Sequence, residues 1–101
     1  MIFQVTVPPM ADDVEEVRIL EWHGEDGRAF RPGELLVEFE THKALVEVRA
    51  AQAGVLRRVL VAAGDWVAIG EPIGILSDAP EEPLPESLDA IADMPVEFLI
   101  D

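Results

Sequence analysis

Short runs of alternating apolar and polar residues recur along the chain and predict β-strands. The first run, FQVTV at residues 3–7, places its three apolar residues on one face of a strand and its two polar residues on the other. Similar runs follow as LLVEF at residues 35–39 and LVEVR at residues 45–49. Glycine and proline recur between the runs too often for helices of ordinary length. The pattern therefore predicts an all-β fold.

An internal repeat relates the two halves of this region. The stretch GRAFRPGELLVEFE, which starts at Gly27, aligns with GDWVAIGEPIGILS, which starts at Gly64. In this alignment Gly33 falls on Gly70, and most apolar residues fall on apolar residues. Each copy consists of short strands separated by glycine turns, so the sequence predicts two copies of one supersecondary unit related by a pseudo-twofold axis.

The only lysine of the chain, Lys43, lies between two of the predicted strands. The protein otherwise uses arginine for its basic residues. Residues 40–44, with the sequence ETHKA, are too few for anything but a tight hairpin turn, which would hold Lys43 at an exposed tip on a rigid base. An ordinary solvated lysine is the alternative, but the uniqueness of Lys43 and its place near the middle of the repeat favour a function.

Several motifs around this lysine together resemble the biotinyl/lipoyl carrier domain family, and within it the lipoyl domains of 2-oxo acid dehydrogenase acyltransferase (E2) components. The resemblance extends from about Val7 to Ser77. It rests on ILEW at residues 19–22, PGELL at 32–36, FETHKALVEV at 39–48, AGVLRRVLVAAGD at 53–65 and IGEPI at 69–73.

The resemblance implies a flattened barrel-sandwich hybrid of two antiparallel sheets, with the chain termini far from the lysine. It also implies that Lys43 is joined by an amide bond to lipoate, and that Glu40, Thr41, His42 and Ala44 present it to a lipoate-attaching enzyme. The implied function is that of a swinging-arm carrier, which catalyses nothing itself. Such a carrier moves acyl groups and reducing equivalents between the dehydrogenase, acyltransferase and dihydrolipoamide dehydrogenase subunits of a 2-oxo acid dehydrogenase complex.

The residues flanking the lysine favour lipoate over biotin. Biotin carriers typically place methionine on both sides of the lysine, whereas here the neighbours are His42 and Ala44, and Met10 and Met94 are remote in sequence. A biotin carboxyl carrier domain remains the alternative with the same fold. A third alternative is an unmodified barrel-sandwich module that binds other proteins.

Two positions depart from the lipoyl pattern. His42 stands where lipoyl domains mostly carry an acid, and ADD at residues 11–13 replaces the usual GES. Both lie in or near surfaces that family members present to partner enzymes, so they bear on which complex the chain serves. His42 is either a solvated turn residue or a group whose titration near neutrality tunes that surface.

Composition narrows the classes of function further. The formal net charge of −14 argues against binding to nucleic acid, because phosphate contacts need clustered basic residues. There is no cysteine, no run long and apolar enough to span a membrane and no signal peptide, which predicts a cytoplasmic protein. HGEDG at residues 23–27 is one residue short of the His-x-x-x-Asp-Gly motif of acyltransferases, and the repeat assigns it to a surface turn. We expect neither a catalytic residue nor a metal site.

The C-terminal part of the chain differs in composition from the rest. We expect residues 1–78 to form the carrier domain and residues 79–101 to form an acidic tail, whose proline-rich first part is a spacer. Ser87 is a candidate cap for a short helix that exposes Leu88 and Ile91, and VEFLI at residues 96–100 alternates like an edge strand. Because the tail also carries many large apolar residues, we expect the part after Ser87 to dock on the barrel, on a partner or on a second copy.

Overall fold

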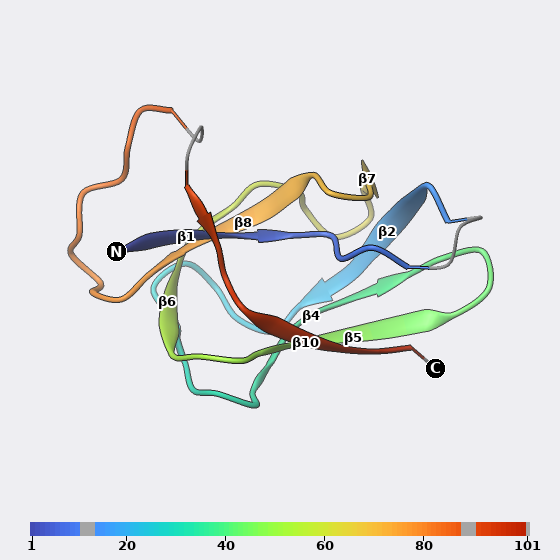
Figure 1. Ribbon diagram of the computed structural model, residues 1–101, viewed down its shortest axis with the longest axis horizontal. Coiled ribbons are helices and arrows are strands. Elements are labelled where there is room, and N and C mark those ends of the chain that lie inside the picture. Colours follow the sequence, from blue (N-terminus) through green and yellow to red (C-terminus); the bar gives the residue numbers. More distant parts are fainter. Residues whose placement is uncertain (11–13, 88–90, 101) are drawn as a thin grey trace.

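The computed structural model describes residues 1–10, 14–87 and 91–100, and it is built from β-strands (Figure 1). In this part of the chain there is no helix, and hence none long and apolar enough to cross a membrane. The predicted all-β fold is confirmed. The strands are β1 (Ile2–Thr6), β2 (Glu16–Trp22), β3 (Ala29–Phe30), β4 (Leu35–Glu40), β5 (Leu45–Ala50), β6 (Gly54–Val59), β7 (Trp66–Ala68), β8 (Pro72–Ser77), β9 (Ala92–Asp93) and β10 (Val96–Ile100).

The strands form two five-stranded sheets that face each other. The first sheet has the order β3-β6-β8-β1-β9, and the second has the order β10-β5-β4-β2-β7. The strand pairs are antiparallel except for the short pair of β1 with β9, which is parallel. The expectation of two antiparallel sheets therefore holds for all but one pair. That pair can be parallel because β9 reaches β1 through a long connection rather than through a hairpin.

The repeat seen in the sequence is a repeat of backbone geometry. Gly27 and Gly64 both have positive φ, of 97° and 96°, and the second pair of aligned glycines has φ of 90° and 87°. Glycine adopts this conformation without the steric cost that other residues incur. The N–H of Gly27 donates to the carbonyl of Leu56, and the N–H of Gly64 donates to the carbonyl of Ile19, both at 2.7 Å. Ile19 aligns with Leu56, so the two halves exchange equivalent bonds and the predicted pseudo-twofold relation is confirmed.

The hydrophobic core lies between the inner faces of the two sheets. The alternation predicted for residues 3–7 is observed, because the three apolar residues are buried and the two polar residues are partly exposed. Burying one such large apolar side chain completely contributes about 1.5–3 kcal/mol relative to leaving it in water. The largest side chains with almost no exposure are Phe30, Phe39, Ile19, Leu36, Leu56, Ile73, Ile75 and Leu76.

The two C-terminal strands each extend one sheet. β9 lies beside β1, and β10 lies beside β5, which is the counterpart of β1 under the pseudo-twofold relation. Between β9 and β10, Met94 enters the core with an exposed fraction of 4% and donates its N–H to the carbonyl of Gln4 at 2.8 Å. The edge strand predicted at residues 96–100 is present as β10. The division of the chain after residue 78 remains a prediction.

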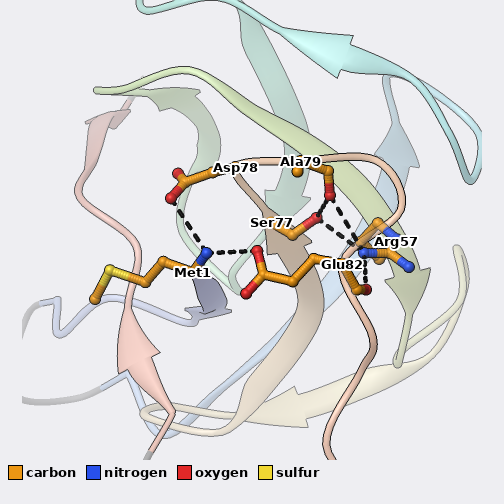
Figure 2. Close-up of polar contacts among 6 residues, drawn as sticks. All are labelled: Met1, Arg57, Ser77, Asp78, Ala79 and Glu82. Atoms are coloured by element: carbon orange, nitrogen blue, oxygen red, sulfur yellow. Dashed lines mark hydrogen bonds and ion pairs between the residues drawn. The ribbon is translucent and has the colours of Figure 1, made fainter.

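Polar contacts fix the start of the C-terminal segment against the first sheet (Figure 2). Nη1 of Arg57, on β6, donates to Oγ of the buried Ser77 at 3.0 Å and to the carbonyl of Glu82 at 2.6 Å. The amine of Met1 is paired with the carboxylates of Glu82 and Asp78. Its hydrogen bond to Glu82 raises the pKa of this amine above its usual value. Of the short helix predicted from Ser87, Leu88 lies outside the described residues, whereas Ile91 is described, lies in no helix and directly precedes β9.

Candidate functional site

The β4–β5 hairpin holds Lys43 where the sequence predicted it. Glu40 pairs with Leu45 at the ends of the two strands, and the N–H of Thr41 donates to the carbonyl of Ala44 at 2.8 Å. This bond closes the turn and leaves His42 and Lys43 as its two tip residues, both exposed. The structure therefore brings all five predicted site residues together in one turn.

The base of the hairpin is rigid because both of its strands are anchored in the core. Val37 and Phe39 on β4, and Val46 and Val48 on β5, are buried on the inner face of the second sheet. The residues between them point outward and are polar, as the alternating sequence requires. Lys43 thus stands on a fixed support at the edge of the molecule.

The hydroxyl of Thr41 organises the tip itself. Its oxygen accepts the N–H of Lys43 at 3.1 Å and the N–H of Ala44 at 3.0 Å. The sequence assigned Thr41 to recognition by a partner and did not show these bonds. The available signal was a threonine two residues before the lysine, in a turn that lacks glycine and asparagine.

Charged side chains surround the hairpin on the outer face of the sheet. Arg18 Nη1 lies 3.1 Å from Glu40 Oε1, and Arg49 Nη2 lies 3.6 Å from Glu47 Oε1. These pairs are partly exposed, so each contributes at most about 1 kcal/mol to stability.

The structure also gathers three potential metal ligands that the sequence did not connect. Glu21 and Glu38 face each other across β2 and β4, and His23 lies between them. His23 Nε2 is 2.6 Å from Glu38 Oε1, and His23 Nδ1 is 3.9 Å from Glu21 Oε2. The two carboxylates therefore approach opposite nitrogens of the ring, so that the imidazole of His23 lies between them.

The C-terminal end of the described chain corrects one expectation drawn from the family. β10 runs antiparallel to β5, and Ile100 pairs with Val46, three positions beyond Lys43. In Figure 1 the end of β10 accordingly lies on the same side of the molecule as the β4–β5 turn, opposite to the N-terminus. The prediction that both termini lie far from the lysine is thus wrong for the C-terminal end. The reason is the added strand β10, which brings the chain back along β5.

Comparison with known proteins identifies the family. The model of a family described as "Biotin-requiring enzyme" matches residues 3–76. The chain is 39% identical over 79 residues to the succinyltransferase component of the 2-oxoglutarate dehydrogenase complex of Bacillus subtilis, and 30% identical over 83 residues to the acetyltransferase component of the pyruvate dehydrogenase complex of Zymomonas mobilis. Both relatives are named as dihydrolipoyllysine-residue acyltransferases. These matches cover 78% and 81% of this chain but 19% of each relative.

A solved structure extends the likeness to three dimensions. The solution structure of the lipoyl domain of the 2-oxoglutarate dehydrogenase complex from Azotobacter vinelandii superposes with a TM-score of 0.66 at 30% identity, covering 75% of this chain and 96% of that domain. The chain therefore belongs to the biotinyl/lipoyl attachment domain family, with the barrel-sandwich fold expected for it. The two relatives named above are acyltransferase components, and the solved structure is a lipoyl domain.

Proposed function

We propose that this chain is a lipoyl carrier domain in which the amine of Lys43 forms an amide with lipoate. The observation that carries the proposal is the position of Lys43, the sole lysine, at the exposed tip of a hairpin anchored in the core. The dihydrolipoyllysine in the names of the relatives, and the lipoyl domain that superposes on this fold, support the same conclusion. When bound, lipoate supplies a disulfide that accepts and releases acyl groups and electrons.

The protein's own contribution is presentation of the attachment point. The buried residues of β4 and β5 hold the hairpin, and the exposed tip leaves the lysine side chain accessible to other proteins. Tethering the cofactor to a small domain replaces free diffusion by encounters at a high effective concentration. The domain itself is a carrier and not a catalyst.

The residues around the tip fit lipoate better than biotin. Neither neighbour of Lys43 is methionine, and Met94, one of the three methionines of the chain, is buried in the core close to Gly54. It is therefore not available beside the lysine. His42 and Ala44 are the only residues directly adjacent to Lys43 in the chain.

The proposed partners follow from the carrier role. They are a lipoate-attaching enzyme, and the dehydrogenase, acyltransferase and dihydrolipoamide dehydrogenase subunits of a 2-oxo acid dehydrogenase complex. The formal net charge of −14 favours partner surfaces that are basic or neutral around their active-site entrances.

Intact mass of the protein purified from its native host tests this function. We expect the mass of one lipoyl adduct on the natural chain and none on Lys43→Arg, which keeps the positive charge and leaves no lysine. The variant should unfold within about 0.5 kcal/mol of the natural chain, because the residue is exposed. A biotin adduct would establish the biotin carrier instead, and an unmodified natural chain from that host would establish an interaction module.

A further inference from the structure

The turn that carries Lys43 does not have the residues that usually stabilise such a turn. Two-residue hairpin turns most often contain Asn-Gly, Asp-Gly or another glycine pair, because these residues readily adopt the left-handed backbone conformation. Here the tip residues are His42 and Lys43. The side chains at the tip therefore give the turn little intrinsic preference, and its conformation depends on neighbouring contacts.

Thr41 supplies those contacts through its backbone N–H and its hydroxyl oxygen. Its N–H donates to the carbonyl of Ala44 at 2.8 Å, which closes the turn through the backbone. Its hydroxyl oxygen then accepts the N–H groups of both Lys43 and Ala44, at 3.1 and 3.0 Å. A hydroxyl oxygen has two acceptor positions, so both are used inside the turn. Thr41 is half-buried, whereas the two tip residues are exposed.

We infer that Thr41 is a positioning residue for modification of Lys43, acting through the backbone amides of the turn and not through contact with the cofactor. This inference rests on the proposed function. An enzyme that acylates Lys43 must receive the amine at a defined place, and small displacements of a reacting group are costly to rate. The direction in which the lysine side chain leaves the turn is set by the backbone that the Thr41 hydroxyl holds.

The chain offers a matched pair of variants for the test. Thr41→Val has nearly the same shape but no acceptor, whereas Thr41→Ser keeps the hydroxyl and loses only a methyl group. Lys43 is present in both. The full chain, produced without lipoate, is incubated with lipoate and the purified lipoate-attaching enzyme of its host, and the adduct is followed by intact mass.

We expect kcat/KM for modification to fall about tenfold in Thr41→Val, because the two hydrogen bonds that hold the backbone N–H groups of Lys43 and Ala44 are lost. In Thr41→Ser, which keeps the hydroxyl, kcat/KM should stay within about twofold of the natural value. Amide hydrogen exchange measured without the enzyme should quicken at Lys43 and Ala44 in Thr41→Val alone. Exchange in the core strands should be the same in all three proteins, which shows that the fold is intact.

Each possible outcome either supports or overturns the inference about Thr41. Modification of Thr41→Val at the natural rate would overturn the inference, as would unchanged exchange at Lys43 and Ala44 in that variant. Slow modification of Thr41→Ser would indicate that the enzyme contacts the methyl group of Thr41 directly. That result would also overturn the inference. If the natural chain is not modified at all, the proposed function fails, and the exchange measurement still shows whether the hydroxyl holds the turn.

Discussion

Trp22 shows how a single residue joins the two sheets. It stands at the end of β2, and its indole N–H donates to the carbonyl of Val61 at 2.9 Å. Its ring lies directly over Gly74 on β8, where a Cβ atom would come within 2.7 Å of Cη2 of the indole. Gly74 is thus required by close packing across the core, and no positive φ is involved.

We predict that Gly74→Ala destabilises the protein by about 1–3 kcal/mol, because the indole must move away and its bond to Val61 is weakened. Gly54→Ala is the control, since a Cβ atom there would meet its nearest neighbours at 3.5 Å, an ordinary contact distance. Both glycines are buried in strands of the same sheet. Urea unfolding measures the difference, and equal stabilities of the two variants would contradict this account of Trp22.

The β4–β5 hairpin carries the proposed attachment site, and the local sequence predicted both of its strands. The runs predicted at residues 35–39 and 45–49 form β4 and β5, and each strand is one residue longer than its run. Strand ends depend on bonds to neighbouring strands, which alternation along one run does not specify. The tip, by contrast, was predicted from the sequence because two strands separated by so few residues leave no other connection.

Exchanging His42 and Lys43 tests whether the lipoate-attaching enzyme accepts a lysine only at position 43 of the turn. Neighbouring tip positions project in different directions, so the moved lysine should fail as a substrate for the lipoate-attaching enzyme. Melting temperature should change little, because both residues are exposed. Intact mass after incubation with the enzyme gives the result. Normal lipoylation of the exchanged protein would show that the side chain's flexibility, and not its position, satisfies the enzyme.

At the scale of the whole molecule, the C-terminal segment joins the two sheets together. It adds β9 to one sheet and β10 to the other, and Met94 between them fills a core position. β10 also covers the backbone edge of β5, the strand that follows the lysine turn. Uncovered edges are prone to pair with other chains. The segment therefore contributes packing to the barrel and covers its edge beside the proposed site.

We predict that ending the chain after Asp78 lowers the free energy of unfolding by at least the cost of losing a buried methionine, about 2–5 kcal/mol. The truncation also removes seven acidic residues, which reduces repulsion and acts in the opposite direction. Thermal unfolding at high salt, where charge effects are screened, isolates the packing contribution. Met94→Ala in the full chain separates the core contact from strand pairing. A truncated protein as stable as the full chain would refute the packing role.

The sequence by itself determined the features that depend on neighbouring residues. Alternation along short runs predicted the strands, the aligned glycines predicted the pseudo-twofold relation, and a lone lysine between two strands predicted the exposed tip. The contacts between distant residues were decided only by the tertiary structure: Trp22 over Gly74, the bridge through His23, and β10 returning beside the lysine turn. The physical reason is that periodicity and turn chemistry act within a few residues, whereas the choice of partner strand depends on which surfaces remain uncovered once both sheets have formed.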